Sequence, residues 1–239
     1  MVEVLDAVPG PAHLSQTPIL DHGSAEVQAL KEQLQRPGMT PREFVQAAHR
    51  HFGEKMRAYY SIDEDRPVSE TLRLNAGSCG QRMAACEALA RSIGVATRVR
   101  ALWLKRAFWN SRLPLLRPFL PERTLMPWPQ FHLEGRWVDF DELFGALPEL
   151  AARTRVKHPF TNRGVSLYDA VRDMPVDFLG KLRGTPHAGY DISHRVAADE
   201  GFFDTRDQLL ATEKKPGRLG RFLFDTLYGG RDIRRIRED

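Results

Sequence analysis

The chain has 239 residues with 42% hydrophobic and 28% charged side chains, a composition that supports a globular protein with a buried core. Its formal net charge of +4 is mild and does not by itself indicate nucleic-acid binding. No segment approaches the roughly 20 apolar residues that cross a bilayer, and no secretory signal, zinc-ligand spacing, phosphate-binding loop or dinucleotide motif is present.

The first part of the chain predicts an arm followed by two helices. Residues 1–22 contain proline and glycine without a clear period, which is typical of an arm. Ser24 is placed to cap a helix that ends before Pro37-Gly38, and Thr40-Pro41 opens the next helix. The second helix carries apolar residues on one face, namely Phe44, Val45, Ala48 and Phe52. An acidic, proline-containing loop is expected over residues 61–70.

A cysteine at the start of a helix is the most informative feature of the chain. The run Gly77-Ser78-Cys79-Gly80 reads as a tight turn, and the residues after it show helical apolar spacing up to Gly94. A thiol in the first turn feels the positive end of the helix dipole, which favours the reactive thiolate. A lone cysteine is more often a core residue, but the flanking glycines indicate an accessible turn. Cys79 is therefore predicted to be a nucleophile.

The second cysteine has a different predicted role. Cys86 lies two turns further along the same helix, too far from Cys79 for a disulfide. We expect it to be a core residue. Two unpaired cysteines favour a reducing, cytoplasmic location.

After this helix, a strand is expected over residues 95–104, with Val99 and Ala101 on one face and Arg98 and Arg100 on the other. The segment 105–124 then combines five basic residues with three prolines and many apolar residues. One interpretation is a mobile lid or docking surface for an anionic or acyl-carrying partner. The other is a connector whose aromatic residues pack on the core while its arginines stay solvated.

A hairpin is predicted over residues 128–141, with a two-residue turn at Glu134-Gly135. In this register residue 132 opposes 137, 130 opposes 139 and 128 opposes 141, and all six share one face of the sheet. A helix is expected to follow, over about residues 141–150. Residues 152–212 predict short helices and loops, and residues 214–239 predict a docked helix with a charged end.

Two of these motifs resemble the transglutaminase-like superfamily of thiol enzymes. The stretch from Gly77 to Arg98 is similar to the family's nucleophile turn, helix and strand start, and Gly135-Arg136-Trp137-Val138-Asp139-Phe140-Asp141 is similar to a later strand. The resemblance covers about residues 40–145. It implies an α+β, papain-like fold with a helical N-terminal half packed on an antiparallel sheet. The expected organisation is an arm (1–22), a core (23–151, with the 105–124 insertion) and a C-terminal extension (152–239) that packs on the core.

The resemblance also implies cysteine-dependent acyl transfer, or amide or peptide hydrolysis, through a thioester enzyme intermediate. The family's histidine position is occupied by Met126, and the nearest histidine is His132. His132 is the candidate base, oriented by Asp139 or Asp141. Two alternatives stay open. Another histidine could enter the site, with His158, His187 and His194 as candidates, or the protein could be a catalytically silent binding or scaffold module.

The remaining expectations concern substrate and partners. Trp128 and Gln130 share the face of His132 and, with Trp109 of the insertion, are candidate substrate-binding residues. The substrate class is an amide, a peptide or a thioester, and an acidic acyl-carrying protein is a candidate partner. The resemblance implies no metal and no organic cofactor.

Overall fold

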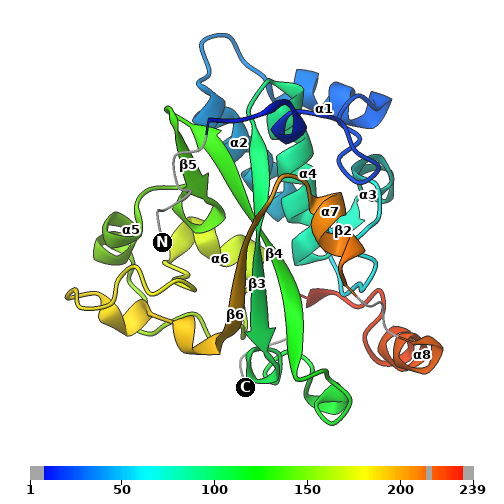
Figure 1. The fold of residues 1–239 in the computed structure, drawn as a ribbon, viewed down its shortest axis with the longest axis vertical. Helices are drawn as coiled ribbons and strands as arrows, with labels where there is room; N and C mark the ends of the chain where they lie inside the picture. The colour runs from blue at the N-terminus through cyan, green and yellow to red at the C-terminus, as the bar shows by residue number, and fades with distance from the viewer. Residues whose placement is uncertain (1–7, 214–216, 234–239) are drawn as a thin grey trace.

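The computed structural model describes residues 8–213 and 217–233, and it combines helices with a curled antiparallel sheet (Figure 1). The sheet has the order β5-β4-β3-β6, and every neighbouring pair is antiparallel. Its strands are β3 (Thr97–Lys105), β4 (Arg123–Leu133), β5 (Arg136–Asp139) and β6 (Val196–Phe203). A separate short parallel pair joins β1 (Arg57–Ala58) to β2 (Ala76–Gly77). The predicted α+β class is therefore present.

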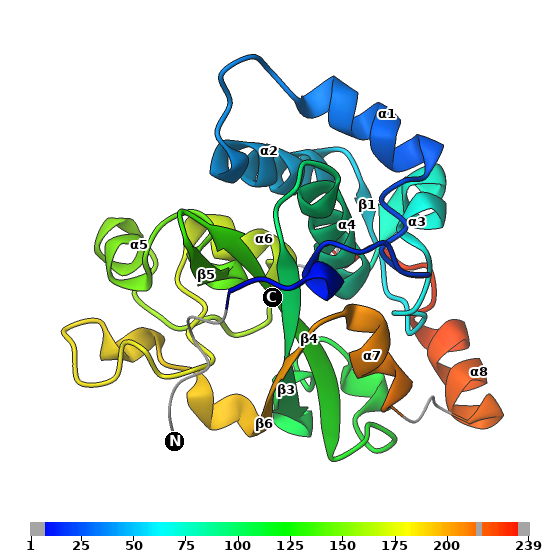
Figure 2. The ribbon, with the colours of Figure 1, turned by 45° about the horizontal axis from the view of Figure 1, so that its top comes forward.

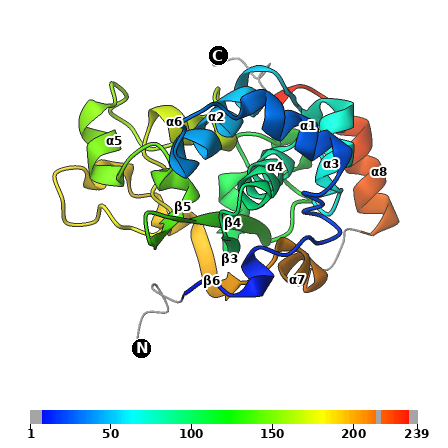
Figure 3. The same ribbon diagram turned by 90° about the horizontal axis from the view of Figure 1, so that it is seen from above.

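Most helices of the first half lie on one side of this sheet, and α7 lies on the other (Figure 3). The eight α-helices in the described part of the chain are α1 (Ala25–Leu34), α2 (Pro41–Glu54), α3 (Val68–Leu74), α4 (Cys79–Ser92), α5 (Leu147–Arg153), α6 (Leu167–Asp173), α7 (Arg206–Ala211) and α8 (Arg218–Leu227). In the view of Figure 2, α4 lies between α2 and the long strands of the sheet. None of the described helices is long and apolar enough to span a membrane.

Local sequence explains where α2 begins and which face it buries. Thr40 caps the helix and forms a reciprocal capping box with Glu43, and Pro41 occupies the first helical position. The predicted apolar stripe is buried, with exposed fractions of 2% or less at Phe44, Val45, Ala48 and Phe52. The sequence pattern therefore located this helix and its core face correctly.

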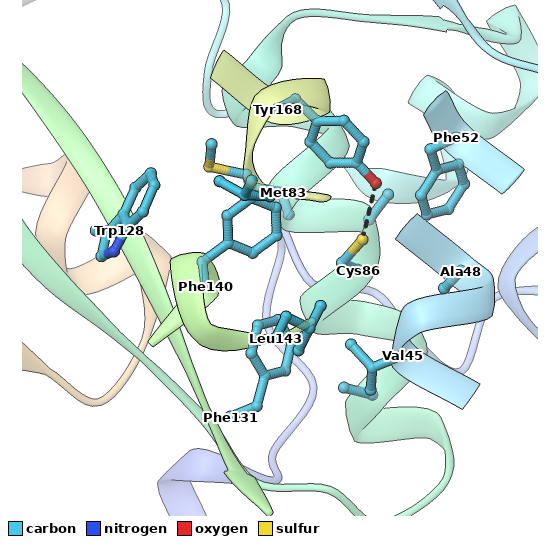
Figure 4. Packing of buried hydrophobic residues seen from close by; sticks show 14 of the residues in the cluster. Val45, Ala48, Phe52, Met83, Cys86, Trp128, Phe131, Phe140, Leu143 and Tyr168 are labelled. Carbon is cyan, nitrogen blue, oxygen red and sulfur yellow. Dashed lines mark hydrogen bonds between the residues drawn. The ribbon is translucent and has the colours of Figure 1, made fainter. Parts of the chain in front are cut away.

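The core is built around α4, whose middle is enclosed on all sides (Figure 4). Cys86 is fully buried there, and its sulfur lies 3.1 Å from the hydroxyl oxygen of Tyr168. Burial raises the pKa of the Cys86 thiol to about 12, so this sulfur stays protonated and inert. The prediction that Cys86 is a core residue is confirmed.

The arm and the C-terminal extension are tied into the same body. Residues 1–7 of the predicted arm lie outside the described residues, but Ile19 and Leu20 are buried, and Arg91 donates hydrogen bonds to the carbonyls of Ala12 and Ser15. The C-terminal extension adds β6 to the sheet beside β3, where the sequence predicted only short helices and loops. That prediction was wrong because β6 has no regular apolar alternation and is interrupted by register shifts near Gly201.

A buried histidine in α2 makes folding sensitive to acid. His49 stacks on Tyr168 with ring centroids 4.3 Å apart, and its Nε2 lies 2.7 Å from the Tyr168 carbonyl oxygen. Burial lowers the pKa of His49 to about 4, from its ordinary value of 6.5. Between these two pH values the unfolded chain binds a proton that the native state does not. Its contribution to stability is complete above pH 6.5 and is lost as the pH falls toward 4.

Through His49 alone, we expect acidification from neutral pH to pH 4 to lower the free energy of unfolding by about 3 kcal/mol. Urea unfolding at a series of pH values measures the loss. The variant His49→Phe should show a flatter pH dependence over the same interval. Identical pH profiles for the two proteins would contradict the assignment.

Candidate active site

The turn before α4 is shaped by tight backbone packing. Asn75 ends α3 in the left-handed conformation (φ 44°), and the chain then passes through β2 into the helix. A side chain on Gly77 would meet Thr71, Arg82 and Met56 at 3.2–3.3 Å, so these neighbours would have to shift to accept one. Cys79 therefore lies at the first position of α4, as predicted.

The helix start is closed by its own polar residues. The Ser78 hydroxyl oxygen accepts a hydrogen bond from the Gln81 amide at 3.1 Å, and the Gln81 side chain accepts one from the Ser78 amide at 3.0 Å. The side-chain Nε2 of Gln81 also donates a hydrogen bond to the carbonyl of Asp63, at 2.8 Å. This capping box holds the first turn rigidly and presents Cys79 as a half-buried thiol.

An arginine is the polar neighbour of the Cys79 sulfur. One terminal nitrogen (Nη2) of Arg82 lies 3.9 Å from Sγ and 3.0 Å from the Ser166 hydroxyl, while the other (Nη1) lies 3.1 Å from Asp169. The guanidinium also lies 4.3 Å from the ring centre of Tyr168. Burial alone would lower the pKa of Arg82, but the charges of Cys79 and Asp169 outweigh it and raise that pKa, so the group is a fixed cation.

A carboxyl group also rests against the first turn. Glu64 accepts a hydrogen bond from the Ser78 hydroxyl at 2.7 Å, and a side chain on Gly80 would collide with its Oε2. Although Glu64 is half-buried as a residue, its Oε2 is enclosed without a hydrogen-bond partner. Burial raises the pKa of Glu64. Gly80 therefore leaves room for an acid beside the helix start.

His132 lies at the opposite end of α4 from Cys79. Its backbone amide donates to the Ala96 carbonyl at 2.9 Å, its ring packs edge-on against Trp137, and a shallow surface hollow places it beside Ile93 and Gly94. The 14-residue helix separates these ends by about 20 Å. The prediction that His132 is the base for Cys79 is therefore wrong: the hairpin register is as predicted, but the hairpin tip lies beyond the C-terminus of α4.

The alternative histidines do not supply the missing imidazole. His158 and His194 are exposed, and His187 is half-buried in a short turn. Within the described residues, no histidine hydrogen-bonds to the Cys79 sulfur. Met126, at the position that the family resemblance gives to the histidine, is buried in the core cluster against which Cys79 packs.

The two predicted aspartates form a separate charged cluster. Asp139 accepts hydrogen bonds from Gln130 at 2.7 Å and from the Lys181 ammonium at 2.6 Å, and the same ammonium lies 2.7 Å from Glu142. Burial raises the pKa of Asp141 well above its ordinary value, although Lys181 opposes this shift. The three carboxylates raise the pKa of Lys181 in turn, against the effect of its own burial. Neither aspartate orients a histidine.

Oxygen atoms of Asp139, Asp141 and Glu142 lie within 4.8 Å of one another, a spacing that a metal ion could use. The ammonium of Lys181 already bonds two of these carboxylates and provides the compensating positive charge. The cluster therefore behaves as a salt-bridge network that holds the end of β5, and we assign no metal to it.

Two predicted substrate-binding residues belong to the interior. Trp128 is fully buried and makes edge-on contacts with Phe140 and Phe178. Gln130 is 1% exposed, and its side chain bridges Arg98 and Asp139. Because neither side chain reaches the surface, the prediction that they bind substrate was wrong. The predicted pairing of Trp128 with residue 141 also fails, because β5 ends at Asp139.

The 105–124 insertion is packed more closely than either interpretation anticipated. Phe108, Leu113 and Leu116 are buried, and Arg112 is 2% exposed, with hydrogen bonds to Asn162 and to backbone carbonyls. Its tip remains open, with Leu115 and Phe119 exposed by 63% and 68%. Trp109 is half-buried and packs, like Cys79, against both the main core and a smaller cluster at the C-terminal end of the chain.

The sequence did not predict that Arg82 and Asp169 belong to the Cys79 site, for a different reason in each case. Arg82 is three residues after Cys79 on the same helix face, so helical spacing could have identified it. Asp169 comes from α6 and Ser166 caps that helix, and nothing in the local sequence indicates that α6 reaches the first turn of α4.

Comparisons with known proteins find a family match, and it lies in the first 142 residues of the chain. Residues 28–142 match the sequence profile of the family described as the transglutaminase-like superfamily. No curated protein and no solved structure gives a significant match to the chain. The matched region runs from α1 through α4 to the end of β5 and the turn after it. Residues 28–142 of this chain therefore form a domain of the transglutaminase-like superfamily.

Proposed function

We propose that the chain uses Cys79 to accept acyl groups from thioesters. The observation that carries this proposal is the Arg82 guanidinium 3.9 Å from the Cys79 sulfur, in a site where no histidine of the described chain hydrogen-bonds to that sulfur. A guanidinium stabilises a neighbouring thiolate by its charge, but it neither takes up nor releases a proton at ordinary pH. The site therefore supports nucleophilic attack without a histidine as the general acid or base.

The lack of a histidine beside Cys79 among the described residues favours one of the substrate classes that the family resemblance leaves open, namely amides, peptides and thioesters. Cleavage of an amide requires a proton for the departing amine, and a histidine normally provides it. A thioester releases a thiolate, which departs without being protonated. In the proposed step Sγ bonds to the acyl carbon, the carbon–sulfur bond of the donor breaks, and the donor leaves as a thiolate. In this proposal, backbone N–H groups at the start of α4 stabilise the oxyanion.

The acceptor that removes the acyl group from Cys79 is an amine or water, and its released proton passes to solvent. An acidic acyl-carrying protein remains the proposed partner. The tip of the insertion offers exposed Arg117 between Leu115 and Phe119, a mixture of charge and apolar surface suited to such a partner. Complex formation should weaken as the salt concentration rises.

A matched pair of small probes tests the proposal. The protein is incubated with an acyl N-acetylcysteamine thioester and, separately, with the amide of the same acyl group, and the adduct is mapped by mass spectrometry. We expect one acyl group on Cys79 from the thioester and none from the amide. Cys79→Ala should abolish labelling, whereas His132→Ala should leave the rate unchanged because His132 lies at the far end of α4.

The main competing function is a binding or scaffold module without turnover. The observation that favours it is Met126, which occupies the family's histidine position and is 4% exposed. Absence of acylation at Cys79 in a protein whose thiol is accessible to iodoacetamide would support this function and exclude thioester transfer. Acylation by the amide probe would instead point to a proton donor other than histidine.

A further inference from the structure

The segment that follows α8 lies beside the Cys79 site. A small cluster, here called the tail cluster, joins this segment to residues from the middle of the chain. Its buried members are Ala58, Tyr60, Leu113, Leu116, Tyr228 and Ile233. Cys79 and Trp109 pack against it. The half-buried Cys79 therefore packs against both the main core and the tail cluster, which includes two side chains from the C-terminal segment.

Backbone hydrogen bonds hold this C-terminal segment against Tyr60, two residues after the end of β1. The amide of Tyr60 donates to the Arg231 carbonyl at 3.1 Å, and the amide of Gly230 donates to the Tyr60 carbonyl at 3.3 Å. Arg112 of the insertion donates to the Ile233 carbonyl at 3.1 Å. Because β1 pairs with β2 directly before Cys79, the segment runs close to the nucleophile turn.

The rings at the centre of the cluster connect the segment to the thiol. Tyr60 and Tyr228 meet edge-on with ring centroids 5.5 Å apart. Burial raises the pKa of Tyr60, and Arg112 partly opposes this shift, while the negative charges of Cys79 and Tyr228 add to it. Tyr60 therefore contacts Tyr228 of the C-terminal segment and belongs to the cluster against which Cys79 packs.

Besides these backbone hydrogen bonds, the segment contributes two buried side chains, Tyr228 and Ile233, to the tail cluster. No residue of α8 is fully buried, and Leu219 and Phe222 are exposed by 72% and 65%. Figure 1 shows α8 in red at the periphery of the molecule. The chain then reverses at two glycines: a side chain on Gly229 would meet the Asp225 backbone at 2.7 Å, and Gly230 has φ 69°. A six-residue segment that follows a glycine turn, and that is held by local hydrogen bonds and two buried side chains, can open without unfolding the core.

We infer that residues 228–233 form a detachable cover that limits access to Cys79. Closed, the cover keeps the thiol from small electrophiles and from an acyl donor. Opened, it exposes Cys79 while α4 and the sheet stay folded. The proposed acyl transfer gives this cover its purpose, but access to the thiol can be measured without any turnover.

The test compares alkylation rates in full-length variants. Ile233→Asp places a charge in the tail cluster, and Tyr228→Ala removes the ring contact with Tyr60 without adding a charge. Each should increase the rate of Cys79 alkylation by iodoacetamide roughly tenfold or more, because opening becomes more frequent. Leu219→Asp changes an exposed residue of the same C-terminal region and should leave the rate unchanged. Buried Cys86 should stay unlabelled in all of them and reports that the core remains folded.

Wild-type rates for both cover variants, with Cys86 protected, would overturn the inference. If a variant also labels Cys86, the native protein decides the question through hydrogen exchange. The Tyr60 amide, which donates to the Arg231 carbonyl, should exchange its hydrogen at the rate at which Cys79 becomes accessible. Labelling of Cys79 faster than this exchange would also overturn the inference. Rapid alkylation in Ile233→Asp without acylation by the thioester probe would reject the proposed function and leave the cover supported.

Discussion

Replacing Arg82 by methionine is expected to slow alkylation of Cys79 at neutral pH by roughly tenfold, because a positive charge next to the sulfur is removed. The guanidinium is fully buried and lies 3.9 Å from Sγ, so solvent does not screen it from the thiolate. The same substitution removes the partner of Ser166 and Asp169 on α6. We therefore also expect a loss of about 3 kcal/mol in unfolding free energy, the usual result of breaking a buried ion pair.

The two effects can be separated by a conservative change. Arg82→Lys keeps the positive charge but loses the planar fork that serves Cys79, Ser166 and Asp169 together. It should restore most of the alkylation rate while recovering only part of the stability. Rates are measured against pH in the Ile233→Asp background, where access does not limit labelling. Equal rates for wild type, methionine and lysine variants would remove Arg82 from the proposed mechanism.

Helix α4, which begins at Cys79, could be predicted from sequence because its determinants are local. The Ser78–Gln81 capping box, Gly77 and the helical run up to Gly94 all act within one continuous stretch. The hairpin was predictable for the same reason, since a two-residue turn at Glu134-Gly135 fixes the register of β4 against β5.

The partner of Cys79 could not be predicted in this way, because it depends on how distant elements pack. The hairpin register is correct, yet His132 lies at the wrong end of α4, since register says nothing of where the hairpin tip lies along the helix. Met126 removes the imidazole that the family resemblance would place on β4, while Arg82 and α6 supply a charged neighbour instead. The C-terminal segment was likewise expected to be a docked helix, and its contact with the nucleophile region emerges only from the folded chain.

The largest stability effect is expected at the contact between α4 and α7. Glu87 and Arg206 are both fully buried, with the Arg206 guanidinium 2.5 Å from the Glu87 carboxylate at its closest approach. Burial raises the pKa of Glu87, and the charge of Arg206 opposes this shift. Replacing Arg206 by leucine leaves the buried carboxylate without its paired cation and should reduce the unfolding free energy by about 3–5 kcal/mol. Glu87→Leu should have a similar effect.

The double variant Glu87→Leu, Arg206→Leu distinguishes an ion pair from simple packing. If charge pairing is the cause, the double variant should be more stable than either single variant, because no uncompensated charge remains in the interior. Urea unfolding of the four proteins measures this coupling. Losses that add without coupling would mean that the two side chains act only through the volume they fill, and that α7 is attached to the nucleophile helix by apolar contacts rather than by this charged pair.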